Sequence, residues 1–78
     1  MTDLRQAIKI ANRQKPSANR YFEQENVYIF VNDDEVEQDG GKSPLVVTKE
    51  DGECLNYAYC LATGMLSTDI ASGLISEV

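Results

Sequence analysis

The stretch that decides the fold is Gly40-Gly41-Lys42-Ser43-Pro44-Leu45-Val46-Val47-Thr48-Lys49-Glu50-Asp51-Gly52-Glu53-Cys54-Leu55-Asn56-Tyr57-Ala58-Tyr59. Residues 45–47 are β-formers, and they follow Pro44, which is tolerated at the first position of a strand. Asp51 and Gly52 come next, and this pair accepts the positive φ angles of a short hairpin turn. The stretch therefore predicts a β-hairpin whose second strand begins at Glu53.

The continuation of this second strand leaves two alternatives open. Read as a strand up to Leu61, it alternates large and small side chains, and its large ones include Leu55, Tyr57 and Tyr59. Read as a helix, it has one apolar face formed by Leu55, Ala58, Tyr59 and Ala62. We favour the strand, because the alternation is regular and tyrosine is common in strands.

The residues before Pro16 predict an amphipathic helix. Thr2 or Asp3 can cap its N-terminus by accepting a hydrogen bond from a free backbone N–H. Its apolar face follows the helical spacing i, i+3, i+4, i+7 at Leu4, Ala7, Ile8 and Ala11. Pro16 ends it, since proline disfavours the helical conformation of the residue before it.

Two strands are predicted between this helix and the hairpin. Residues 19–23 contain Tyr21 and Phe22, which favour extended structure, and the polar residues 24–26 form a turn after them. Residues 27–31 are all apolar or aromatic. A continuous apolar run predicts burial on both faces, so this strand is expected at the centre of the sheet.

Beyond Gly64 the sequence predicts a final helix. Ser67 can cap it, Asp69 suits its first turn, and its apolar side is formed by Ile70, Leu74 and Ile75. The predicted fold class is therefore α+β: an N-terminal helix, a small antiparallel sheet of three to four strands and a C-terminal helix. A chain of 78 residues predicts a single domain over 1–78, near the lower size limit for a self-sufficient core.

Charge is unevenly distributed along the chain, which carries −6 overall. Residues 1–20 hold five basic residues and one acidic residue, whereas residues 21–78 hold two and twelve. Arg5, Lys9 and Arg13 share one side of the first helix, which is either a solvated face or a patch that pairs with acids or phosphate. Net acidity argues against direct nucleic-acid binding, which needs basic residues along the phosphates.

Five acidic residues fall within seven positions: Asp33, Asp34, Glu35, Glu37 and Asp39. The spacing does not fit a calcium loop, because the twelfth position would be Val46 instead of a bidentate glutamate. The alternatives are a solvated loop, a contact surface for a basic partner, or weak binding of divalent cations. We expect no metal site and no cofactor.

Catalytic signatures are missing from the sequence. It contains no histidine, no Gly-x-Ser-x-Gly and no Gly-rich nucleotide motif, and Gly40 to Ser43 fails as a phosphate loop because Val36 stands where glycine is required. Cys54 and Cys60 match no zinc pattern, and reduced thiols are expected. No apolar run reaches the roughly 18 residues of a membrane span. We expect a cytoplasmic protein that is not an enzyme.

The segment from Gly41 to Glu53, preceded by an apolar strand ending at Val31 and an acidic spacer, resembles the YrhB-like bacterial proteins, grouped with the immunity protein 35 family of polymorphic toxin systems. The resemblance implies a small α+β protein that binds and neutralises a cognate toxin. It carries over no functional residue, because Gly41, Pro44 and Gly52 match only as turn-forming residues.

The leading hypothesis is a non-catalytic cytoplasmic protein that binds a basic protein partner, such as a toxin. The acidic residues 33–39 would meet the partner's basic surface, and Tyr21 or Tyr57 would supply much of the affinity. One alternative is a phage or plasmid-encoded acidic inhibitor that mimics nucleic acid. Another is a small structural or chaperone-like module that forms a homodimer through an open strand edge. No membrane contact is expected.

Overall fold

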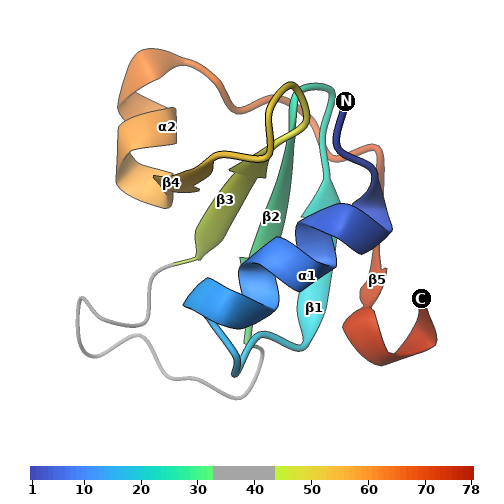
Figure 1. Cartoon of the computed structure of the whole chain (residues 1–78). Coiled ribbons are helices and arrows are strands. Elements are labelled where there is room, and N and C mark those ends of the chain that lie inside the picture. The colour runs from blue at the N-terminus through green and yellow to red at the C-terminus, as the bar shows by residue number, and fades with distance from the viewer. Residues whose placement is uncertain (33–43) are drawn as a thin grey trace.

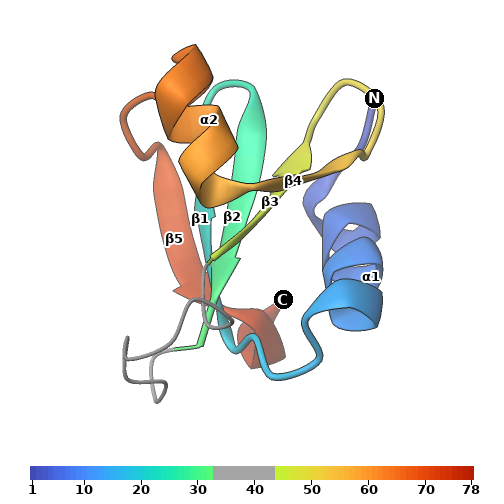
Figure 2. The ribbon, with the colours of Figure 1, turned by 90° about the vertical axis from the view of Figure 1, so that its left-hand side faces the viewer.

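The computed structural model describes residues 1–32 and 44–78, and within them five strands form one antiparallel sheet in the order β4-β3-β2-β1-β5. Along the chain the elements are α1 (Leu4–Gln14), β1 (Arg20–Glu23), β2 (Val27–Val31), β3 (Leu45–Thr48), β4 (Cys54–Asn56), α2 (Tyr57–Thr63), β5 (Ala71–Leu74) and the short 3₁₀ helix η2 (Ile75–Glu77). The two α-helices lie on opposite faces of the sheet (Figures 1 and 2). The α+β class is confirmed.

The central strand β2 is buried on both faces, as predicted. Tyr28 and Phe30 pack with Ala7 and Ala11 of α1. On the other face, the fully buried partners of Cys60 from α2 are Val27 and Val46. The sheet thus has a small core on each side, and both cores depend on β2.

The first helix matches its prediction closely. The Asp3 carboxylate accepts from the Gln6 backbone N–H at 2.9 Å, and the Gln6 side chain accepts from the Asp3 N–H at 3.1 Å. This reciprocal pair satisfies two backbone donors that a helix start leaves free. The helix ends at Gln14, two residues before Pro16, and its last turn is closed by the Lys15 N–H on the Ala11 carbonyl.

The β-hairpin predicted around Asp51 and Gly52 is confirmed. Its strands β3 and β4 pair with Val46 opposite Leu55 and Val47 opposite Cys54. Gly52 has a φ of 70°, which supplies the left-handed conformation that the turn needs. The Thr48 N–H closes the turn on the Glu53 carbonyl at 2.9 Å.

The prediction that the second strand continues to Leu61 is wrong, because the chain turns into α2 at Tyr57. The Asn56 side chain accepts from the Tyr59 N–H at 2.9 Å and caps the helix, and Gly64 ends it in the left-handed region with a φ of 74°. As a helix, the segment buries Cys60 against the second face of the sheet. Coverage of that face outweighs the strand preference of tyrosine.

The predicted C-terminal helix is also wrong, because residues 71–74 form strand β5 on β1. The polar residues expected to cap that helix are engaged elsewhere. The buried Gln24 donates to the Asp69 carboxylate and accepts from the Ser67 N–H, each at 2.9 Å. These bonds involve residues 67–69, which are not helical and lead into β5. With β5 the described sheet has five strands, one more than the upper limit of the prediction.

Gly73 in β5 lies directly under Tyr21 of β1. A Cβ atom at this position would sit 3.3 Å from both Cε1 and Oη of that ring. An aromatic side chain over a glycine in an edge strand covers backbone that would otherwise be exposed. The tyrosine therefore compensates for the weak strand preference of the glycine.

Both cysteines are free. Cys54 packs in the core beneath α1, whereas Cys60 packs in the core beneath α2. Burial raises the pKa of each thiol above its ordinary value. Among the described residues, no helix is long and apolar enough to cross a membrane.

Two glycines allow a matched test of the hairpin turn. Gly52 and Gly64 share a positive φ, but a Cβ at Gly52 would lie 2.9 Å from Cδ1 of Ile10, whereas one at Gly64 would meet nothing within 4 Å. We expect Gly64→Ala to lower the free energy of unfolding by about 1 kcal/mol, through backbone strain alone. Gly52→Ala should cost somewhat more, about 1–2 kcal/mol, because the ends of the Ile10 and Thr2 side chains must also shift. Urea denaturation measures both, and equal losses would show that the turn does not press on α1.

Candidate partner-binding site

A cleft opens where the β1–β2 turn and the β3–β4 turn lie side by side. The Lys49 N–H donates to the Asn26 carbonyl at 2.9 Å and ties the two turns together. The cleft has a volume of about 730 Å³. Four exposed carboxylates line it, and they are Glu25, Glu50, Asp51 and Glu53. We call this the acidic cleft.

The acidic cleft also has apolar walls. Leu55 and Met65 line it and are half-buried, and Tyr59 lines it while 56% of its surface is exposed. The exposed side of α2 continues outward from Tyr59. Leu61 on this helix is 63% exposed, and the helix carries no charged residue. We call Ala58, Tyr59, Leu61 and Ala62 the α2 surface.

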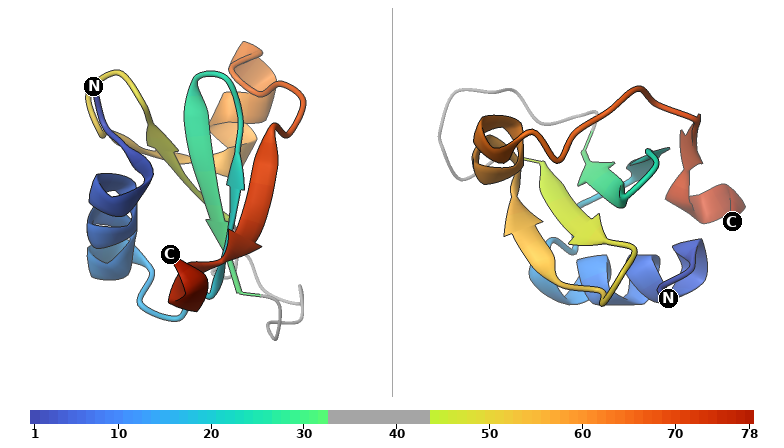
Figure 3. Two further views of the ribbon diagram at one scale, coloured as in Figure 1. Left: turned by 90° about the vertical axis from the view of Figure 1, so that its right-hand side faces the viewer. Right: turned by 90° about the horizontal axis from the view of Figure 1, so that it is seen from above.

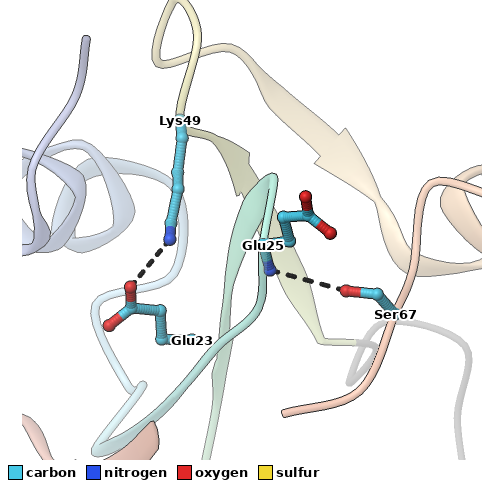
Figure 4. Close-up of polar contacts among 4 residues, drawn as sticks. All are labelled: Glu23, Glu25, Lys49 and Ser67. Carbon is cyan, nitrogen blue, oxygen red and sulfur yellow. Dashed lines mark hydrogen bonds and ion pairs between the residues drawn. The ribbon is translucent and has the colours of Figure 1, made fainter. Parts of the chain in front are cut away.

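Lys49 also lines the cleft, but its charge is compensated by another residue. Its Nζ lies 2.7 Å from a carboxylate oxygen of Glu23 (Figure 4). The same atom lies 5.0 Å from the centre of the Tyr28 ring. Only 14% of the Lys49 side chain is exposed. Burial, and after it the charge of Glu23, raises the pKa of Tyr28, while the lysine acts in the opposite direction. The Lys49 ammonium therefore pairs with Glu23 at this end of the strands. It does not compensate the negative charge of the four cleft carboxylates.

Asp51 is held ionised by its neighbours in the turn. The Thr48 hydroxyl donates to its carboxylate at 2.5 Å, and the Glu53 N–H donates to the same oxygen at 3.3 Å. Hydrogen bonds to the charged form lower a carboxyl pKa. The hydroxyl makes the largest contribution, and the pKa of Asp51 lies below its ordinary value. The negative charge at this point of the cleft thus persists under mildly acidic conditions.

The wall that carries Met65 is fixed by hydrogen bonds to the β1–β2 turn. Ser67 donates its N–H to the Gln24 side chain, and its hydroxyl accepts from the Glu25 N–H at 3.4 Å (Figure 4). The Glu25 carboxylate takes no part in the second contact, which uses only the backbone of that residue. The cleft is therefore built on three segments that are joined to one another by hydrogen bonds.

Of the predicted partner-binding residues, the described structure places only Tyr21 and Tyr57. Asp33, Asp34, Glu35, Glu37 and Asp39 lie outside the described residues. Tyr21 packs in the core beneath α1 and over Gly73, whereas Tyr57 packs with the core beneath α2. The two tyrosines thus belong to opposite faces of the sheet. A flat partner surface cannot contact both.

Tyr57 lines a second hollow, on the α2 face of the sheet. This hollow has a volume of about 490 Å³, and its apolar lining comes from Phe22, Ile29, Val31, Pro44 and Tyr57. Val31 and Pro44 are close in sequence to the two ends of segment 33–43. Tyr57 remains available as a contact residue near those ends.

The residues of the acidic cleft were not predicted as a site. Glu50 and Asp51 were assigned only to the hairpin turn, Glu53 to the start of the second strand, and Glu25 to a different turn. A signal was present, since acidic residues flank both hairpin turns. Their convergence depends on the pairing of β2 with β3, which places both turns at the same end of the sheet.

The side chains of this site are of the kinds that bind cationic groups. Carboxylates bind ammonium and guanidinium groups, and an exposed tyrosine ring can stack on them. Within residues 1–32 and 44–78, no group of three acidic, cysteine or histidine side chains is arranged to hold a metal ion.

Comparison of the chain with protein-family models, curated proteins and solved structures found no match.

The hydrogen bond between Thr48 and Asp51 can be tested by titration. Thr48→Val removes the donor and should move the Asp51 pKa upward toward its ordinary value, whereas Thr48→Ser keeps the donor and should leave it low. A lowered carboxyl pKa stabilises the fold above the unfolded-state pKa, and this stability is lost as the pH falls through the folded-state pKa. The valine variant should therefore lose less stability on acidification. NMR titration of the carboxyl carbon gives the pKa, and an unchanged value in Thr48→Val would contradict this role of the hydroxyl.

Proposed function

We propose that this protein is a non-catalytic binding protein that captures a basic segment of a partner protein with its acidic cleft and α2 surface. The observation that carries the proposal is the position of Tyr59. This exposed ring lies both in the cleft, beside four carboxylates, and on a helix side without charge. A solvated tyrosine between apolar and acidic surface is a suitable anchor for a partner.

The arrangement follows the general anatomy of protein interfaces. Such interfaces have an apolar centre, often with an aromatic anchor, and a polar rim that remains near water. Here Tyr59 is the exposed aromatic anchor, Ala58 and Ala62 lie beside it on the outer side of α2, and the carboxylates lie along one side of it. The acidic rim selects for lysine and arginine on the partner and speeds encounter through long-range attraction.

We further propose a cytoplasmic location and a toxin as the partner. The toxin assignment follows from the sequence resemblance to the YrhB-like and immunity protein 35 proteins, which implies neutralisation by binding. A toxin whose surface is basic would meet the complementary charge of a chain that carries −6. The acids at residues 33–39 would add to this attraction, and Tyr57 would offer a second contact.

A mimic of nucleic acid fits the described carboxylates less well. Such a protein needs negative charges spread along a surface in the manner of phosphates. The described carboxylates at the cleft gather instead at one end of the sheet, around the two turns. This clustering favours a compact basic segment of a protein as the ligand.

The anchor role of Tyr59 can be tested once the partner is isolated. Tagged wild-type protein is used to recover partners at low and moderate salt from the cells that encode it, and the partner is identified by mass spectrometry. We expect Tyr59→Ala to weaken its affinity by about 30-fold, corresponding to about 2 kcal/mol for an interface anchor. Ile70→Ala is the matched control, because Ile70 is 65% exposed and does not line the cleft. Equal effects of the two variants would exclude the α2 surface as the contact.

The two sets of acidic residues can be separated by association kinetics. One variant combines Glu50→Gln, Asp51→Asn and Glu53→Gln, and a second replaces the five acids of residues 33–39 by their amides. We expect both to slow association by about tenfold and to flatten its salt dependence, because both remove long-range attraction. Only the cleft variant should also speed dissociation, since its residues lie beside Tyr59. Unchanged association in both would show that the acids are bystanders, and competition of the partner by DNA would favour the nucleic-acid mimic.

A further inference from the structure

The two edge strands of the sheet, β4 and β5, differ in their surroundings. Strand β4 is three residues long, and its last residue, Asn56, caps α2, so the chain leaves this edge at once. Strand β5 lies beyond β1, and no described strand pairs with its outer side. Figure 3 shows this edge facing the viewer, without another element in front of it.

Hydrogen bonds fix which backbone groups of β5 point outward. The Ile75 N–H donates to the Asn19 carbonyl at 2.9 Å, and Gly73 and Ala71 lie opposite Tyr21 and Glu23 of β1. Because alternate residues of an antiparallel strand turn their backbone groups to the same side, Ala71, Gly73 and Ile75 face β1. The N–H and C=O groups of Ser72 and Leu74 therefore face away from the sheet.

The edge lacks the features by which monomeric proteins protect such strands. Natural edges carry charged residues, often lysine, or proline, and these prevent pairing with another chain. Residues 70–76 contain neither a charged residue nor a proline. Ile70, directly before the strand, is 65% exposed. The outer side of β5 can therefore pair with a strand of another chain.

We propose that β5 pairs antiparallel with β5 of a second copy of this chain, so that two sheets join into one continuous sheet. A two-fold axis through Gly73 places Ser72 of one copy opposite Leu74 of the other, and both residues present outward backbone groups. Each Ser72–Leu74 pair exchanges two backbone hydrogen bonds. The strand is thus complementary to itself, as a two-fold interface requires.

The centre of this pairing suits its residues. Gly73 would face its own symmetry mate in the closer type of antiparallel pair, where a residue without a side chain is tolerated. The Tyr21 ring of each copy already covers its own glycine. The two rings would come side by side across the axis and cover the junction on the α1 face.

Charge sets the conditions under which the dimer forms. Asp69 precedes the strand and Glu77 follows it, and antiparallel pairing brings Asp69 of one copy and Glu77 of the other to the same end of the interface. The chain also carries −6 as a whole. Like charges repel and salt screens this repulsion, so added salt should strengthen the dimer. A complex with a basic partner would show the opposite salt dependence.

The test is sedimentation velocity of the full chain from about 10 μM to about 1 mM, at about 50 mM and about 500 mM NaCl. We expect a dimer that grows with concentration and is favoured by salt. Ser72→Pro removes an outward N–H donor and should lower the association constant at least tenfold, whereas Ser72→Ala keeps the donor and should match the wild type. Circular dichroism verifies that each variant is folded.

A second variant keeps the test decisive if Ser72→Pro does not fold. Glu77→Lys places opposite charges at the interface, so it should tighten the dimer and weaken or reverse its dependence on salt. A wild-type chain that stays monomeric throughout would overturn the proposal and leave the edge open for another protein. A dimer that neither Ser72→Pro nor Glu77→Lys alters would also overturn it, because the contact would lie elsewhere.

Discussion

The structure depends on the need to cover both faces of β2. Its five residues are apolar or aromatic, so neither face can be left to water without a loss of about 1.5–3 kcal/mol for each large side chain. The first helix covers Tyr28 and Phe30, and the second face requires another element. The residues directly after β4 form α2, which covers that face and buries Cys60 against Val27 and Val46.

The short length of α2 explains why this face is also the candidate site. A helix of seven residues buries Cys60 completely, but it leaves Tyr59 and Leu61 exposed on its outer side. It lies over β3 and β4. The α2 face farther along the sheet retains the hollow beside Tyr57. Small domains have limited material with which to cover their apolar surface. In this chain the remaining apolar surface lies next to acidic turns.

The sequence predicted those elements whose signals are local. The helix before Pro16 has a capping residue and a regular apolar face, the hairpin has Asp51-Gly52, and residues 27–31 form an unbroken apolar run. The two failures share a different cause. Residues 57–63 suited either a strand or a helix, and the decision came from the uncovered face of β2, which lies about 30 residues away in the sequence.

The C-terminal failure came from a polar signal with a distant partner. Ser67 and Asp69 resemble helix-capping residues, but both bind Gln24, which is 43 and 45 residues away. Gly73 lies under Tyr21 through the pairing of β5 with β1, which no local pattern encodes. The acidic cleft was not predicted for the same reason, because the pairing of β2 with β3 brings Glu25 and Glu53 to one cleft.

The two proposed surfaces can act together because of the strand order. The α2 surface adjoins β4 and the open edge is β5, so four strand spacings of about 4.8 Å separate the edges of the sheet. A dimer joined through β5 would therefore carry its two α2 surfaces toward the far edges of a continuous sheet, with an acidic cleft beside each. Capture of basic segments there would lower the net negative charge of each copy. Since that charge opposes dimer formation, partner binding and dimerisation should favour each other through electrostatics alone, without any change in the fold.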